Sequence, residues 1–230
     1  EATPNSVLTN TTTMSKKSIR HDSHMARLVI LDSQLMQASP THVVACSGMD
    51  ALVQAIEAFT SRYATWFSEV LALKALELIR NSIEQVHNDP ASALADDLLT
   101  GSYTAGLSLC NARLGVIHGI VHPIGAIYGV PHGLACAICL APALRLNREA
   151  MDAKYDAMSR AVGGDLMAVA QMLVSNLGLR SPLAGRPIMQ RERIIAETLS
   201  SGSTAANPKP ITEADVSALL EALFANEGES

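Results

Sequence analysis

A regular spacing of apolar residues between Trp66 and Val86 restricts the fold of this chain more than any other feature of its sequence. The apolar positions recur at steps of three and four and are Phe67, Val70, Leu71, Ala75, Leu78, Ile79 and Ile83. Such steps place side chains on one face of an α-helix, so we predict a helix whose apolar face lies in a core. A chain of 230 residues, 48% of them hydrophobic, is long enough to bury that core.

Helical patterns extend over most of the remaining sequence. DALVQAIEAF, residues 50–59, is predicted to be helical, and further helices are predicted at about 90–112, 149–162, from 165, at 190–199 and at 212–224. Asp165 and Thr212 are expected to be N-caps, because their side-chain oxygens can accept hydrogen bonds from unpaired backbone N–H groups. We therefore predict a mainly α fold.

The N-terminal segment has a different pattern. Two short apolar or β-branched runs, NSVLT at 5–9 and RLVILD at 27–32, are separated by polar residues. This pattern predicts two strands and a connection. We expect residues 1–36 to hold these strands and residues 37–230 to form a helical domain.

Composition and charge argue against several classes of function. Charged residues make up only 17% and the net charge is -5, so no basic surface is expected for binding nucleic acid. The longest apolar stretches are interrupted before about 18 residues accumulate, so we expect no membrane span. Four cysteines, at positions 46, 110, 136 and 139, are too few for the disulfide framework of a small secreted protein. A reducing cytoplasm is the expected location.

Three histidines lie within fifteen positions of one apolar segment. His118 and His122 are four apart in VIHGIVHP and would share a helix face, and a turn from Pro123 to Pro131 would fold His132 back towards them. Two histidines at helical spacing occur by chance in many proteins. An imidazole in so apolar a setting is nevertheless costly unless it is hydrogen-bonded or binds a metal.

Other polar positions in the two segments are Asp50, Gln54, Cys136 and Cys139. Asp50 and Gln54 are also four apart, which gives a carboxylate and an amide oxygen on one helix face. Cys136 and Cys139 form a C-x2-C pair, but no second pair is present and both lie in an apolar run. Packing in the core is the expected role of these cysteines.

Two long segments give the sequence a family resemblance. GMDALVQAIEAFTS at 48–61 and GVIHGIVHPIGAIYGVPHGLACAICLAP at 115–142 resemble the signature regions of the iron-containing (group III) alcohol dehydrogenases. The resemblance covers essentially the whole chain. It implies a helical bundle domain of the dehydroquinate synthase-like kind at 37–230, preceded by a short β segment left over from the nucleotide-binding domain at 1–36. Most of that nucleotide-binding domain is expected to be absent from this chain.

The resemblance also implies a metal site. In this family a divalent ion, usually iron and sometimes zinc, is held by an Asp and a His four residues apart and by two further His. These positions fall on Asp50, Gln54, His118 and His132. Gln54 departs from the pattern, because a neutral amide is a weaker ligand than imidazole. Weaker binding, a harder ion, three protein ligands with water, or a metal-independent mechanism all remain open.

Further roles follow from the resemblance. It implies that His122 acts in proton transfer near the nicotinamide, although a histidine that only stabilises the helix is the alternative. It places Asn5, Val7 and Lys16 beside NAD or NADP. Lys16 is followed by Lys17, so a solvated pair of lysines on a polar loop is the more ordinary explanation for this residue.

Three functions remain open at this stage. The first is a metal-dependent, NAD(P)-linked dehydrogenase acting on a small alcohol or carbonyl compound, with little turnover expected of this chain alone. The second is a reductase of an oxo acid such as maleylacetate, with Arg113 as a candidate for binding substrate carboxylates. The third is a non-catalytic metal-binding helical domain. A homo-oligomer is possible in each case, since a domain separated from its partner exposes apolar surface.

Overall fold

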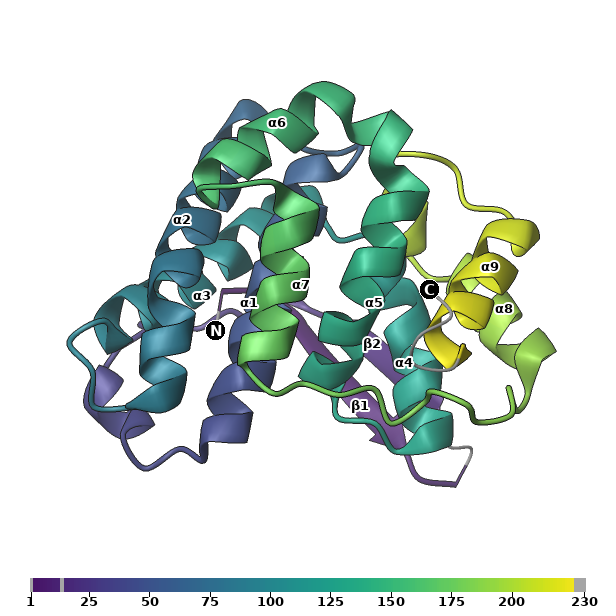
Figure 1. The fold of residues 1–230 in the computed structure, drawn as a ribbon, viewed down its shortest axis with the longest axis horizontal. Coiled ribbons are helices and arrows are strands. Elements are labelled where there is room, and N and C mark those ends of the chain that lie inside the picture. The colour runs from purple at the N-terminus through teal and green to yellow at the C-terminus, as the bar shows by residue number, and fades with distance from the viewer. Residues whose placement is uncertain (1, 13–14, 226–230) are drawn as a thin grey trace.

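A computed structural model describes residues 2–12 and 15–225, apart from the side chains of Thr9 and residues 15–18. Within these residues the chain forms a two-stranded hairpin, four short 3-10 helices and nine α-helices (Figure 1). The strands are β1 (Asn5–Asn10) and β2 (Ser15–Arg20), and the 3-10 helices are η1 (Asp22–His24), η2 (Ser33–Met36), η3 (Arg148–Met151) and η4 (Thr204–Ala206). The α-helices are α1 (Thr41–Thr60), α2 (Trp66–Asn88), α3 (Ala95–Ala112), α4 (Val116–Tyr128), α5 (His132–Asn147), α6 (Asp152–Ala161), α7 (Leu166–Asn176), α8 (Arg191–Leu199) and α9 (Glu213–Phe224). The predicted mainly α fold is confirmed.

The hairpin corrects one of the two predicted strands. The strand expected at 5–9 is β1, but its antiparallel partner is β2, with Asn5 opposite Arg20. The predicted strand at 27–32 is wrong: this segment is irregular, and Leu28 and Ile30 are 77% and 78% exposed. An apolar run becomes a strand only where another strand pairs with it, whereas nearby segments pair at a low loop-closure cost. The division of the chain at residue 36 stays a prediction.

Helix α1 is the centre of the bundle. It packs against α2, α3 and α5, and 13 of its 20 residues are buried. Figure 1 shows α2 and α3 on one side of α1 and α5, and α8 and α9 on the other. By length and composition α1 is the one described helix that could cross a membrane, but 72% of its apolar window is buried inside the domain. It is placed as a core helix.

Helix α2 forms where it is predicted, but its buried face is confirmed only in part. Ile79 and Ile83 are fully buried, as expected. Phe67 and Val70 are 47% and 61% exposed, and Leu76, which was not assigned to the face, is fully buried instead. The apolar face of the first two turns is therefore rotated from the prediction.

A polar cap explains this rotation. Thr65 and Ser68 form a capping box at the start of α2, and Ser68 is buried. The backbone carbonyl of Ser68 accepts a hydrogen bond of 2.8 Å from the hydroxyl of Ser108 on α3. The small residue Ser68 therefore faces α3, while the larger Phe67 on the same turn is 47% exposed.

The segment with the three histidines contains a longer helix than expected. The predicted turn from Pro123 to Pro131 is wrong, because α4 continues through Pro123 to Tyr128. Burial of Ile120 and Ile124 compensates for the backbone hydrogen bond that proline removes. The turn begins at Gly129, whose left-handed backbone (φ 70°) ends α4, and Pro131 directly precedes α5.

Candidate metal centre

Helix α1 presents three polar side chains along one face. Asp50, Gln54 and Glu57 are four and three residues apart, so they follow each other over two turns of the helix. The side-chain amide nitrogen of Gln54 donates a 3.1 Å hydrogen bond to Oδ2 of Asp50. Glu57 is only 5% exposed. Buried carboxylates need partners, and the partner of Glu57 lies on α4.

Glu57 fixes both the start of α4 and the ring of His118. Its Oε1 accepts a hydrogen bond of 2.7 Å from the backbone N–H of Ile117, one of the unpaired donors at the helix N-terminus. Its Oε2 lies 2.6 Å from Nδ1 of His118. The other ring nitrogen, Nε2, is thereby turned to Oδ1 of Asp50, at 3.3 Å.

Helix α5 supplies His132 and Cys136 from successive turns. The first turn of α5 lies against α1, because Gly133 has no side chain: a Cβ atom there would lie 2.6 Å from the carbonyl carbon of Cys46. Without a Cβ at Gly133, the backbones of α1 and α5 approach closely at this point. This approach brings Nε2 of His132 to 3.7 Å from Oδ1 of Asp50.

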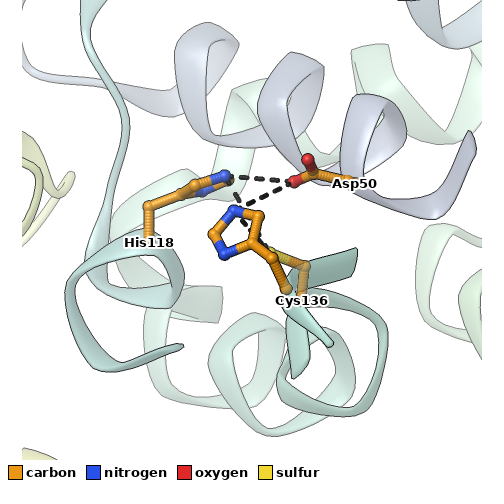
Figure 2. A group of neighbouring side chains, drawn as sticks. Asp50, His118 and Cys136 are labelled. Atoms are coloured by element: carbon orange, nitrogen blue, oxygen red, sulfur yellow. Dashed lines mark hydrogen bonds and ion pairs between the residues drawn. The ribbon is translucent and has the colours of Figure 1, made fainter. Parts of the chain in front are cut away.

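Four potential ligand atoms from three helices therefore converge. The thiol sulfur of Cys136 lies 3.9 Å from Nε2 of His118 and 3.8 Å from Nε2 of His132. One ligand atom from each of Asp50, His118, His132 and Cys136 lies within 4.8 Å of the other three. Figure 2 shows Asp50 and His118 facing each other, with Cys136 approaching from a third direction. Within the described residues, this is the one such group of histidine, cysteine and acidic side chains.

The local electrostatics oppose charge on the sulfur and favour charge on the carboxylate. Burial alone raises the pKa of Asp50, but the hydrogen bond from His118 and the charges of His118 and His132 outweigh it and lower the pKa. Burial lowers the pKa of His118, but interactions with Cys136, Asp50 and Glu57 raise it overall. Burial raises the pKa of Cys136 to about 12, so its thiol keeps its proton at neutral pH.

These residues fit a divalent transition metal. Carboxylate, imidazole and thiolate are the usual protein ligands of zinc and related ions. A metal-binding histidine normally holds its second nitrogen against a carboxylate, and Glu57 has this relation to His118. Three of the four predicted ligands, Asp50, His118 and His132, are brought together, whereas Gln54 hydrogen-bonds to Asp50. The role of each remains a prediction.

The cluster borders a large cleft. This cleft of about 1570 Å³ is lined by His118, His122 and His132 and, from the hairpin, by Asn5 and Val7. His122 is beside the cluster, its ring centroid 5.4 Å from that of His132. The structure thus brings the predicted catalytic histidine and two predicted cofactor-binding residues to one space. Lys16 pairs with Thr9 in the hairpin, but its side chain lies outside the described residues.

Sequence reasoning missed two members of this site. Cys136 was expected in the core, and it is fully buried, but it also contacts both imidazoles. Cys139 is buried as expected and lies outside the cluster. The available signals were spacings: Cys136 follows His132 by four residues, and Glu57 follows Asp50 by seven.

This chain is similar over nearly its whole length to several alcohol dehydrogenases and related reductases. Long-chain-alcohol dehydrogenase 1 of Geobacillus thermodenitrificans is 30% identical over 250 residues, covering 98% of this chain and 60% of that protein. A crystal structure of 1,3-propanediol oxidoreductase matches 96% of this chain and 62% of its own with a TM-score of 0.90 and 27% identity. Sulfoacetaldehyde reductase from Bifidobacterium kashiwanohense in complex with NAD+ matches 96% and 60%, with a TM-score of 0.88 and 25% identity.

Each of these matches covers nearly all of this chain but only part of the related protein. This chain spans about 60% of the length of these three proteins. Residues 44–224 match the family described as Fe-containing alcohol dehydrogenase family, C-terminal, and this range includes all four clustered side chains and His122. The chain therefore belongs to the iron-containing alcohol dehydrogenase family, of which it carries the C-terminal helical region.

Proposed function

We propose that this protein is a metal-dependent, NAD(P)-linked dehydrogenase that interconverts a small alcohol with its aldehyde or ketone. The observation that carries the proposal is the convergence of Asp50, His118, His132 and Cys136 beside a cleft of about 1570 Å³. Family membership supports the reaction class. The proposed location is the cytoplasm, which is supported by four free cysteines.

Each group in the cleft has a proposed task. A bound Fe²⁺ or Zn²⁺ would polarise the substrate oxygen, which makes hydride transfer to or from the nicotinamide easier. Asp50, His118 and His132 are proposed to hold this ion. His122, in the second turn of α4, lines the cleft and is proposed to carry the proton between the substrate oxygen and solvent. Asn5, Val7 and Lys16 are proposed to contact the cofactor.

The cofactor and the substrate class have support from the relatives. One solved structure with the same fold, a sulfoacetaldehyde reductase, contains NAD+. Other relatives are a long-chain-alcohol dehydrogenase and a 1,3-propanediol dehydrogenase. We propose NAD or NADP as the hydride carrier and an unbranched alcohol or its aldehyde as the substrate class.

The test is turnover with defined metal content. The protein expressed from its own gene is stripped of metal, reloaded with Fe²⁺ or Zn²⁺, and assayed for NAD(P)H formation with a series of primary alcohols. We expect activity that requires metal and that His132→Ala abolishes. His42→Ala, at an exposed histidine on α1, is the matched control and should leave activity unchanged. Full activity after metal removal would contradict the proposal.

One observation favours a second candidate, an oxo acid reductase. Arg113 lines the cleft, with its guanidinium stacked 4.5 Å from the centroid of the Tyr63 ring. A cation held there by an aromatic ring can bind a substrate carboxylate. This candidate predicts reduction of oxo acids in preference to neutral aldehydes, weak dependence on metal, and loss of the preference in Arg113→Gln. Competition between the two substrate classes distinguishes it from the alcohol dehydrogenase.

A further inference from the structure

We propose that Cys136 is the fourth protein ligand of the metal, in place of Gln54, and that the resulting set of one carboxylate, two imidazoles and one thiolate selects Zn²⁺ over Fe²⁺. This inference rests on the proposed metal-dependent function, because it concerns the same ion. It differs from the ligand set that the sequence resemblance implies, in which Gln54 holds the fourth position and Cys136 has no role.

The distances in the cluster are close to those of a tetrahedral site. Bond lengths of about 2.0–2.2 Å to nitrogen or oxygen and about 2.3 Å to sulfur give tetrahedral edges of about 3.3 Å between N and O and about 3.6 Å between N and S. The observed N–O separations from Asp50 are 3.3 Å to His118 and 3.7 Å to His132. The observed N–S separations of Cys136 are 3.9 and 3.8 Å. The remaining two separations, between the two imidazoles and between Asp50 and Cys136, lie within 4.8 Å. An ion would therefore draw the four side chains closer together.

Gln54 is engaged in a different contact. Its amide nitrogen donates to Oδ2 of Asp50, and Oδ1 is the carboxylate oxygen that faces both histidines. Gln54 therefore orients the Asp50 carboxylate with one oxygen towards the cluster. This is the contribution of a positioning residue, and it leaves the fourth corner of the site to the sulfur of Cys136.

The chemistry of the sulfur determines the preferred ion. Binding replaces the S–H bond by a metal–sulfur bond, and the thiol proton passes to solvent, so no oxidant or reductant is needed. Two negative ligands, Asp50 and the thiolate, then balance the charge of a divalent ion. Thiolate is a soft ligand and favours Zn²⁺ over Fe²⁺ more strongly than an imidazole or an amide does.

Cys139 provides the matched control. It is on the same helix, three residues further on, and is also buried, but it is not part of the cluster. A cysteine-to-serine change at either position removes one sulfur from the core with little change in volume. Only the change at Cys136 removes a ligand, so the two variants separate coordination from packing.

Cobalt absorption tests the assignment directly. The full chain, Cys136→Ser and Cys139→Ser are stripped of metal and titrated with Co²⁺, whose bond to a thiolate gives a near-ultraviolet charge-transfer band. We expect the band at one ion per chain in the parent and in Cys139→Ser, and its loss in Cys136→Ser. Zn²⁺ affinity should fall more than about tenfold in Cys136→Ser, since loss of an outer-shell partner alone already costs 10–100-fold.

Several results would overturn the inference, and they distinguish it from the proposed function. A parent chain that binds one Co²⁺ without a thiolate band would exclude Cys136 as a ligand while leaving the metal site intact. Absence of Co²⁺ and Zn²⁺ binding in the parent would overturn both proposals. If Cys136→Ser does not fold, X-ray absorption at the zinc edge of the parent decides: a sulfur neighbour at about 2.3 Å is required, and nitrogen and oxygen neighbours alone contradict it.

Discussion

Nδ1 of His118 lies 2.6 Å from Oε2 of Glu57, while Nε2 of the same ring lies 3.3 Å from Oδ1 of Asp50. The two ring nitrogens therefore have separate partners, both carboxylates of α1. The Glu57 carboxylate also accepts the backbone N–H of Ile117. It thus determines at the same time where α4 begins and which nitrogen of His118 is directed to the cluster.

Replacing Glu57 with glutamine should weaken metal binding. Glutamine keeps an oxygen for Ile117 or for the ring, but it removes the negative charge that orients His118 and increases the basicity of its Nε2. Loss of such an outer-shell partner lowers metal affinity by about 10–100-fold. The measurement is a Zn²⁺ titration against a competing chelator. Glu84→Gln, at an ion pair with Arg80 on α2, is the control, and equal affinities for both variants would show that Glu57 does not act on the site.

Replacing Gly133 with alanine should damage stability and the site together. The added Cβ would meet the backbone carbonyl group of Cys46, which cannot move aside as a flexible side chain can. Overpacking of this kind costs about 1–3 kcal/mol of the free energy of unfolding. Because α5 must shift, His132 should also leave its place and metal affinity should fall. Urea unfolding measures the first effect and metal titration the second.

Gly202→Ala is the control for this change, because a Cβ at Gly202 has no other atom within 4 Å. Its free energy of unfolding and its metal affinity should match those of the parent. A Gly133→Ala variant as stable as Gly202→Ala would mean that α1 and α5 do not approach as closely as described.

Local signals in the sequence predicted the N-caps of α7 and α9, but not the first residues of α1 and α3, which are Thr41 and Ala95 and not positions 50 and 90. Thr212 accepts a hydrogen bond from the N–H of Asp215 in a capping box, and Asp165 accepts one from Ala168, as their side chains suggested. These contacts span three residues, so they can be read from a short window. The strand expected at 27–32 failed for the opposite reason, because strand formation depends on a partner that local sequence does not specify.

The residues of the candidate metal site also fall into two groups, those that the sequence predicted and those that it did not. Asp50, His118 and His132 were predicted because their spacing and a family resemblance agree. Glu57 and Cys136 were not, because their roles depend on how α1, α4 and α5 pack, and an acidic residue or a cysteine in an apolar helix has no local feature that reveals this. Only the assembled helices show that both touch His118.

The exposed face of α2 gives a test of the observed packing. Trp66 is 77% exposed, whereas Leu76 is fully buried. Trp66→Ala should change the free energy of unfolding by no more than about 0.5 kcal/mol, as surface substitutions usually do. Leu76→Ala removes core contacts and should cost about 2–5 kcal/mol. Urea denaturation of both variants measures the two free energies of unfolding. A larger loss for Trp66→Ala than for Leu76→Ala would indicate that α2 buries a different face.

Asp215 should make the stability of the C-terminal region depend on pH. Burial raises the pKa of Asp215, but hydrogen bonds from Lys209 and Thr212 lower it overall. A carboxyl group whose folded pKa lies below its unfolded value of about 3.9 stabilises the fold above that pH. This stabilisation is lost as pH falls through the lowered folded pKa.

The variant Asp215→Asn tests this dependence. At pH 7 it should lower the free energy of unfolding by about 1 kcal/mol or less, since the ion pair with Lys209 is partly exposed. The difference from the parent should shrink below about pH 4, where the parent carboxylate takes up its own proton. Urea unfolding at several pH values measures it. Glu213→Gln, in the same helical turn, is the control, and a difference for Asp215→Asn that is constant with pH would contradict the assignment.

His122 should affect turnover without affecting metal content. Its ring lies beside His132 and borders the cleft, but it is not one of the four clustered ligands. If His122 carries a proton between substrate and solvent, His122→Gln should lower kcat by roughly 10²–10⁴-fold, the usual contribution of a general acid or base. Glutamine keeps a polar side chain of similar length, so the cleft should retain its shape and one ion per chain should still bind. Elemental analysis and steady-state kinetics on the same preparation separate the two effects. Loss of the ion together with activity would instead make His122 a metal ligand, and an unchanged kcat would leave it the structural role of stabilising α4 beside Pro123.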